Sequence, residues 1–142
     1  MPQDRASKSR STDIPVSVLI VEDHRDNREL LEEYFAFAGC AVATATTGAE
    51  AIAVAKVMRP HVVLMDLVLP GTMDGWEATR QFMSHPVLKG SVVIAVTAHG
   101  FPSDIEKAKR AGCHAVFVKP YDLVALGEEV QRLGAGRRSA ES

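Results

Sequence analysis

The 142-residue chain is long enough to bury one hydrophobic core, and its 46% hydrophobic and 24% charged residues are ordinary for a globular domain. Its formal net charge of -2 argues against a nucleic-acid binder or a polybasic membrane protein. No apolar run approaches the roughly 18 residues that span a bilayer, and residues 1–15 lack the apolar core of a signal peptide. Cys40 and Cys113 form no close-spaced motif, which predicts two buried thiols in a reducing compartment. We therefore expect a cytoplasmic single domain.

Strands and helices are predicted to alternate between two flexible tails, residues 1–15 and 134–142, with the folded domain at 16–133. In chain order, the predictions are a strand at 16–21, a helix from about 26 to 38, a strand at 40–45, a helix at 48–58, a strand at 62–66, a helix from 75 to about 83, a strand at 91–97, a helix from 103 to about 112, a strand at 115–119 and a helix at 123–133. Asp74, the pair Ser103–Asp104, and Asp122 are predicted to cap the last three helices. Connections of this length suit crossovers between parallel strands, so we expect a parallel sheet with helices on both faces.

Polar residues stand at or just after the carboxyl ends of four of these strands. They are Glu22 and Asp23, Asp66, Thr97 and Lys119. In an open parallel sheet these ends share one rim, where ligands bind. The sequence therefore predicts three carboxylates, a hydroxyl and an ammonium at a single site.

The chemistry of this set is narrow, because clustered carboxylates must bind protons or a cation. Oxygen ligands without Cys or His favour Mg²⁺, for which we expect Mn²⁺ to substitute. A cation, an ammonium and a hydroxyl around one carboxylate would stabilise a phosphoryl group passing to Asp66. No glycine-rich nucleotide loop is present, so the phosphoryl donor is expected to be a protein or a small phosphate ester. Val68 stands where a haloacid-dehalogenase-type phosphatase would need a second aspartate.

At these residues the sequence resembles the response-regulator receiver family of two-component signalling. The matching pieces are Val18–Asp23 (VLIVED), Val62–Pro70 (VVLMDLVLP), Met73–Gly75 (MDG), Val96–Ala98 (VTA) and Val118–Pro120 (VKP). The resemblance covers about residues 16–133 and implies a flavodoxin-like (βα)5 doubly wound sandwich, with a five-stranded parallel sheet of order 2-1-3-4-5 and helices on both faces.

The resemblance also implies a role for each residue of the rim. Asp66 looks like the phospho-acceptor, Thr97 like the switch hydroxyl and Lys119 like the phosphate-neutralising lysine. The implied Mg²⁺ ligands are Glu22, Asp23, Asp66 and the backbone carbonyl of Val68. His24 is expected at the surface rather than on the metal, because Mg²⁺ prefers oxygen.

Three positions depart from the usual family pattern. The first acid is Glu22 where Asp is common, and the loop from Asp66 to Gly75 is one residue longer. Val116 stands three residues before the lysine, where the family often has an aromatic residue; Phe117 is next to it, on the opposite face of the strand.

The leading hypothesis is a stand-alone response regulator that takes a phosphoryl group from a sensor histidine kinase or a histidine phosphotransfer protein. Because the chain ends soon after the last helix, its output is expected to be a protein contact through the face of the fourth helix, fifth strand and fifth helix. It is expected to catalyse only its own phosphoryl transfer and dephosphorylation, to be a monomer or weak dimer, and to bind neither nucleic acid nor membrane. The alternative is a pseudo-receiver that binds partners constitutively without phosphorylation; a Mg²⁺-dependent hydrolase would need a substrate pocket motif and a general base, which the sequence lacks.

Overall fold

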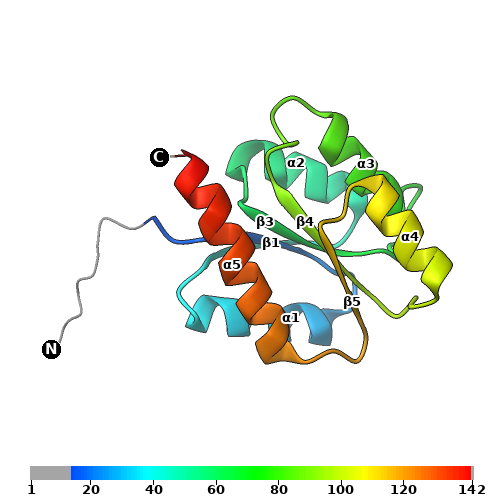
Figure 1. The fold of residues 1–142 in the computed structure, drawn as a ribbon, viewed down its shortest axis with the longest axis horizontal. Helices are drawn as coiled ribbons and strands as arrows, with labels where there is room; N and C mark the ends of the chain where they lie inside the picture. The colour runs from blue at the N-terminus through cyan, green and yellow to red at the C-terminus, as the bar shows by residue number, and fades with distance from the viewer. Residues whose placement is uncertain (1–13, 142) are drawn as a thin grey trace, which may run out of the picture.

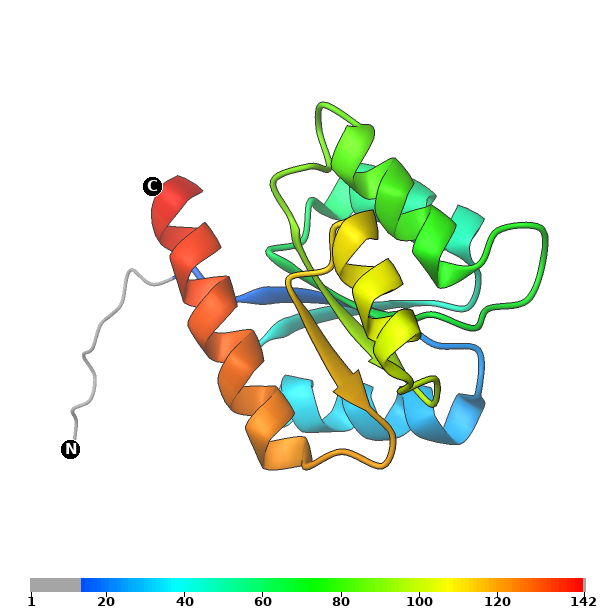
Figure 2. The same cartoon turned by 45° about the vertical axis from the view of Figure 1, so that its right-hand side comes forward.

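The computed structural model describes residues 14–141; the predicted N-terminal tail lies almost entirely outside the described residues. Five parallel strands form one sheet in the order β2-β1-β3-β4-β5. Helices cover both faces of the sheet, with α1 and α5 on one side and α2, α3 and α4 on the other (Figure 1; Figure 2). This is the flavodoxin-like sandwich that the sequence predicts, so the predicted fold is confirmed.

The ten predicted elements are all present. The strands are β1 (Ser17–Val21), β2 (Ala41–Ala45), β3 (Val62–Asp66), β4 (Val92–Thr97) and β5 (Ala115–Val118). The helices are α1 (Arg25–Phe37), α2 (Gly48–Met58), α3 (Gly75–Ser84), α4 (Pro102–Ala111) and α5 (Leu123–Glu141). Strand boundaries differ from the predictions by at most one residue.

The sheet separates two hydrophobic clusters, because successive side chains of a strand point to opposite faces. Leu19 and Val21 of β1 face α2, α3 and α4, whereas Val18 and Ile20 face α1 and α5. Every residue of β3 and β4 is buried, as expected for central strands covered on both sides. The strands thus pack between two hydrophobic layers, and their carboxyl ends carry the polar rim.

The predicted caps at Asp74 and Asp122 are confirmed, the predicted cap at Ser103–Asp104 is wrong, and Thr47 caps α2 without having been predicted. Thr47 Oγ1 accepts a hydrogen bond from Glu50 N–H at the start of α2, and Asp74 Oδ1 accepts one from Glu77 N–H at the start of α3. Asp122 Oδ1 likewise accepts the N–H of Val124 before α5. The predicted cap of α4 at Ser103–Asp104 is wrong: Pro102 is the first residue of α4, where a proline loses no helical hydrogen bond.

Helix α5 corrects the predicted end of the domain. The helix was expected to end near Leu133, with a flexible tail from Gly134, but it continues to Glu141. Gly134 does not end the helix because it packs closely against Val16 and Val62, where a Cβ atom would collide with Val16. The glycine that suggests a helix stop is therefore a packing glycine.

The two cysteines differ in burial. Both cysteines are free thiols. Cys113 is buried, as predicted, and burial raises the pKa of its thiol to about 11; Cys40 is only half-buried. Within residues 14–141, no helix combines the length and the apolar character that crossing a bilayer requires.

Candidate functional site

The polar residues predicted at the strand ends meet at one rim of the sheet. Asp66 is the last residue of β3 and Thr97 the last of β4, while Glu22 and Asp23 follow β1 and Lys119 follows β5. A pocket opens at this rim, lined by Asp23, His24, Asp66, Val68, Leu69, Pro70, Ala98, His99 and Lys119. Asp23, Asp66 and Lys119 thus line one pocket, although they come from the ends of three different strands.

Asp66 presents a buried carboxylate at the centre of this rim. The residue is only 5% exposed; its Oδ1 accepts the Val68 N–H at 3.1 Å, and its Oδ2 lies 3.5 Å from Lys119 Nζ. Burial raises the pKa of Asp66 above its ordinary value, and the negative charge of Glu22 raises it further, against the opposing effects of the Val68 N–H and Lys119. A cation entering the pocket would stabilise the charged carboxylate.

Lys119 joins the two buried carboxylates of the site. Its Nζ lies 3.1 Å from Glu22 Oε1 as well as 3.5 Å from Asp66 Oδ2. Burial alone would lower the pKa of this ammonium, but the charges and hydrogen bonds of Asp66 and Glu22 outweigh burial and raise it. Lys119 therefore stays positively charged in this pocket.

Glu22 and Asp23 are oriented by the turn that leads into α1. The Arg28 guanidinium donates to the carbonyl oxygens of both residues, at 3.1 and 3.2 Å, a constraint that the sequence did not suggest. Glu22 is buried, and its Oε2 accepts the His24 N–H at 3.1 Å. In the described part of the chain, the buried Oδ1 of Asp23 has no hydrogen-bond donor. A buried carboxylate oxygen of this kind suits a divalent cation, so the residues present fit Mg²⁺.

Thr97 is fully buried and connects the site to the loop before α4. Its Oγ1 accepts the N–H of His99 at 3.0 Å. The Lys119 N–H donates to the Thr97 carbonyl at 2.7 Å, so the two residues are fixed to each other through the backbone. Among the described residues, the Thr97 hydroxyl thus makes one hydrogen bond, to the β4–α4 loop.

The aromatic residue of β5 lies on the far side of the sheet from α4, as strand alternation predicts. Val116 packs against the cluster under α2, α3 and α4, whereas Phe117 belongs to the cluster under α1 and α5. Phe117 contacts Tyr121 edge to face, with ring centroids 6.4 Å apart. No aromatic side chain of β5 is therefore available beside Thr97.

The loop that follows Asp66 contains the extra residue seen in the sequence. Gly71 adopts a φ of +93°, a conformation that favours glycine. The loop returns to the sheet at Gly75, whose N–H donates to the Leu67 carbonyl at 2.9 Å. The Val68 side chain is 49% exposed at the edge of the pocket.

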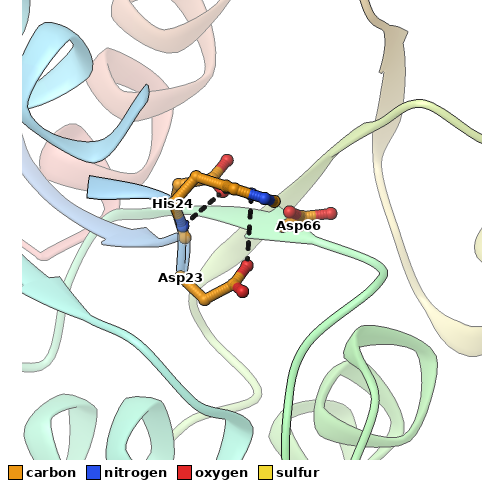
Figure 3. Close-up of side chains that lie close together, drawn as sticks. Asp23, His24 and Asp66 are labelled. Carbon is orange, nitrogen blue, oxygen red and sulfur yellow. Dashed lines mark hydrogen bonds and ion pairs between the residues drawn. The ribbon is translucent and has the colours of Figure 1, made fainter. Parts of the chain in front are cut away.

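His24 lies at the surface, as the sequence predicts, and its imidazole is close to the acidic residues of the site. Its side chain is 72% exposed, yet donor atoms of Glu22, Asp23, His24 and Asp66 all lie within 4.8 Å of one another. Figure 3 shows the imidazole ring above the Asp23 carboxylate, extending toward Asp66. The only signal in the sequence is the position of His24 next to Asp23.

The parallel sheet of this order and the acidic rim with its threonine and lysine define a receiver domain of two-component signalling. The sequence matches the response regulator receiver domain family over residues 18–131, and the chain belongs to this family.

Individual relatives agree with this assignment. The polar-differentiation response regulator DivK of Brucella anthropi is 33% identical over 118 residues, which cover 83% of this chain and 95% of DivK. The receiver domain of the sensor histidine kinase PA1611 from Pseudomonas aeruginosa, solved with a magnesium ion in its active site cleft, superposes with a TM-score of 0.78 at 29% identity, covering 86% of this chain and 99% of that one. The receiver domain of Saccharomyces cerevisiae Ssk1, crystallised with the histidine phosphotransfer protein Ypd1, superposes with a TM-score of 0.78 at 29% identity, covering 85% of this chain and 90% of that one.

Proposed function

We propose that this chain is a response regulator that accepts a phosphoryl group on Asp66 and signals through a phosphorylation-dependent protein contact. The observation that carries the proposal is the position of the Asp66 carboxylate, buried at the end of β3 near the Lys119 ammonium and near Asp23 Oδ1, which accepts no hydrogen bond from any described residue. The Lys119 ammonium, and a cation held by the Asp23 oxygen, would thus both stabilise negative charge beside one nucleophilic carboxylate.

In the proposed step, a carboxylate oxygen of Asp66 attacks the phosphorus atom of the donor. The new bond joins this oxygen to phosphorus, while the bond from phosphorus to the donor's histidine nitrogen, or to the acetate oxygen of acetyl phosphate, breaks. The leaving group departs with the electron pair of that bond. Lys119 balances the negative charge of the phosphoryl oxygens, and the Thr97 hydroxyl donates a hydrogen bond to one of them.

The residues proposed to hold Mg²⁺ are Asp23, Asp66 and the backbone carbonyl of Val68, with Glu22 as a further acidic group of the pocket. When bound, the ion would neutralise the charge that these carboxylates and the phosphoryl oxygens share. The magnesium ion in the cleft of the PA1611 receiver domain supports this proposal. The hydrogen bond from the Val68 N–H to Asp66 Oδ1 supports the role proposed for Val68, because it holds the adjoining peptide groups beside the carboxylate.

The proposed donors are a sensor histidine kinase or a histidine phosphotransfer protein, and the complex of the Ssk1 receiver domain with Ypd1 supports the second. The proposed output face comprises α4, β5 and α5. Phe101, which is 75% exposed before α4, and Val118 of β5 offer apolar contacts on this face. Phosphorylation would act by favouring one of two conformations of this face. We place the protein in the cytoplasm, where its donors and two free thiols would be found.

The experiment is to incubate the protein with acetyl phosphate and Mg²⁺ and to measure the intact mass. We expect one added phosphoryl group in the wild type, none in Asp66→Asn, and none when Mg²⁺ is removed by a chelator. Asp74→Asn is the matched control: Asp74 is an exposed helix cap, and its variant should be labelled like the wild type. Absence of labelling in the wild type, with a second receiver domain labelled in parallel, would refute the proposal.

A constitutive pseudo-receiver is the other outcome of this test. Trp76 is the one tryptophan of the chain, and its ring lies edge to face with that of His99, which lines the pocket, so we use its emission as the reporter. We expect saturable Mg²⁺ titration of this emission. If Mg²⁺ did not change the Trp76 emission and acetyl phosphate added no phosphoryl mass, the protein would be a pseudo-receiver that binds partners constitutively.

A further inference from the structure

His24 lies beside the acidic pocket, where its imidazole could take part in binding a metal ion. His24 lies between β1 and α1, and its backbone N–H bonds Glu22 Oε2. Its Nδ1 is 3.3 Å from the same Glu22 oxygen and 3.6 Å from Asp23 Oδ1. Both the backbone and the ring of His24 are therefore directed to the acidic residues, despite the exposure of its side chain.

The spacing of the donor atoms suits a shared ion. Ligands at 2.0–2.2 Å from one metal ion lie no more than about 4.4 Å apart. The Nδ1 to Oδ1 distance of 3.6 Å is within this limit, and the full set, with donor atoms within 4.8 Å of one another, needs only a small movement.

The hydrogen bonds already made by the carboxylate oxygens of the pocket limit which of these oxygens can bind an ion. Glu22 is occupied at both oxygens, by Lys119 at Oε1 and by the His24 N–H at Oε2. Asp23 Oδ1 is buried and has no donor in the described part of the chain. Asp66 accepts the Val68 N–H at Oδ1 and lies 3.5 Å from Lys119 Nζ at Oδ2. That Asp23 oxygen is thus the starting point of the candidate ion site, and the side chains of His24 and Asp66 converge on it (Figure 3).

We propose that His24 supplies an imidazole nitrogen ligand to this site, and that the site therefore binds borderline divalent transition-metal ions, of the Zn²⁺ and Co²⁺ class, in preference to Mg²⁺. Mg²⁺ prefers oxygen ligands and gains little from an imidazole. Transition-metal ions bind nitrogen and mixed sites more tightly, in the order of the Irving–Williams series. The preference for these ions over Mg²⁺ therefore depends on His24.

The proposal rests on the proposed function, because the ion shares Asp23 and Asp66 with Mg²⁺. A transition-metal ion would compete with Mg²⁺ for the carboxylate that accepts the phosphoryl group. Phosphorylation of Asp66 would then respond to the balance of metal ions as well as to the donor.

The test measures binding of Zn²⁺, Co²⁺ and Mg²⁺ to the full chain without a phosphoryl donor, at one pH above the ordinary pKa of imidazole. Calorimetry gives the dissociation constants, and the visible spectrum of bound Co²⁺ reports nitrogen ligation. We expect His24→Asn to weaken Zn²⁺ and Co²⁺ binding at least tenfold and to change the Co²⁺ spectrum, while the Mg²⁺ constant changes less than twofold. Asp23→Asn should weaken all three ions, because they share this carboxylate.

His99→Asn is the matched control, because His99 lines the same pocket but is not among the clustered donor atoms. It should leave the Co²⁺ spectrum unchanged. Equal loss of Zn²⁺ affinity in both histidine variants, or equal loss of Mg²⁺ and Zn²⁺ affinity in His24→Asn, would overturn the proposal. Because no phosphoryl donor is present, failure of the metal proposal is seen here and failure of phosphorylation is seen in the mass measurement.

Discussion

The Lys119 ammonium lies closer to Glu22 than to Asp66, at 3.1 Å against 3.5 Å. It therefore serves as the shared counter-ion of two buried carboxylates, rather than as the partner of Asp66 alone. The longer glutamate side chain reaches back to the lysine, while the shorter Asp23 side chain remains at the pocket with an oxygen that has no donor in the described structure. Glu22, which stands where the family commonly has an aspartate, thus forms an ion pair with Lys119.

Replacing Lys119 by methionine should destabilise the fold and tighten Mg²⁺ binding. Removal of one partner of a fully buried ion pair costs about 3–5 kcal/mol; because 23% of the Lys119 side chain is exposed, we expect about 2 kcal/mol at pH 7 without Mg²⁺. Added Mg²⁺ should offset much of this loss, since it replaces the missing positive charge. Urea unfolding with and without Mg²⁺ measures both effects.

The matched control for Lys119→Met is Lys56→Met, an exposed lysine of α2. It should change the free energy of unfolding by less than about 0.5 kcal/mol, with no dependence on Mg²⁺. Equal destabilisation of the two variants would mean that Lys119 is not a counter-ion of the site.

Replacing Asp66 by asparagine should stabilise the fold at neutral pH in the absence of Mg²⁺, by about 0.5–2 kcal/mol. Burial and Glu22 raise the pKa of Asp66, so the folded state holds the proton more tightly than the unfolded state does. The stability of the wild type therefore falls as the pH rises through this raised pKa, whereas asparagine does not titrate. The advantage of Asp66→Asn should be largest above that pKa and disappear in acid.

Mg²⁺ supplies the second readout for Asp66→Asn. Binding to the folded wild type stabilises it by mass action, so the difference between the two proteins should narrow or reverse as Mg²⁺ is added. Thermal unfolding over a range of pH, with and without the ion, measures this. A variant less stable than the wild type under all conditions would show that Asp66 contributes to folding.

Local signals in the sequence predict the fold and most residues of the polar rim, because helix caps and strand ends depend on residues that are close together in the sequence. Asp74 and Asp122 cap helices through bonds to N–H groups two or three residues ahead. The carboxyl ends of parallel strands meet at one edge, so the strand order and the site could be derived together.

The errors come from interactions between residues distant in the sequence. Gly134 was interpreted as a helix stop, but its contact with Val16 and Val62 makes it part of the core. The hydrogen bonds from Arg28 to the carbonyl oxygens of Glu22 and Asp23 were missed, because Arg28 carries no motif. The periodicity of apolar residues and the spacing of motifs predict neither the packing of Gly134 nor the hydrogen bonds of Arg28.

Gly75 permits the close approach of α3 to the strand end that carries Asp66, so Gly75→Ala should be destabilising. A Cβ atom at this position would stand 2.5 Å from Leu67 Cα, and it would also collide with the Asp66 carbonyl. Because this contact is with backbone, we expect a loss of about 1–3 kcal/mol and slower phosphorylation of Asp66. Chemical unfolding and mass labelling with acetyl phosphate measure the two effects.

Gly136→Ala provides the opposite control, because a Cβ atom there meets nothing within 4 Å on α5. It should stabilise the protein by about 0.5–1 kcal/mol and leave labelling unchanged. If Gly75→Ala were no more destabilising than Gly136→Ala, the path of the loop after Asp66 would not depend on the glycine.

Thr97 should transmit phosphorylation to α4 by way of His99 and Trp76 rather than through an aromatic residue of β5. The Thr97 hydroxyl accepts the His99 N–H, the His99 ring meets the Trp76 ring edge to face at 6.2 Å, and Lys107 Nζ of α4 lies 4.2 Å from the Trp76 ring centroid. A hydroxyl that turns to donate to a phosphoryl oxygen would weaken its bond to His99. The β4–α4 loop would then shift against Trp76, whose buried Nε1 has no partner among the described residues to hold the ring.

Tryptophan emission, recorded together with the phosphorylated mass, tests this route. We expect acetyl phosphate and Mg²⁺ to change the emission of the wild type and of Thr97→Ser, which keeps the hydroxyl. Thr97→Val should still gain the phosphoryl mass, more slowly, but lose most of the emission change per phosphorylated molecule. Asp66→Asn separates the effect of phosphorylation from that of Mg²⁺ alone. A full emission change in Thr97→Val would place the link outside the threonine hydroxyl, because a valine of the same shape cannot make either hydrogen bond.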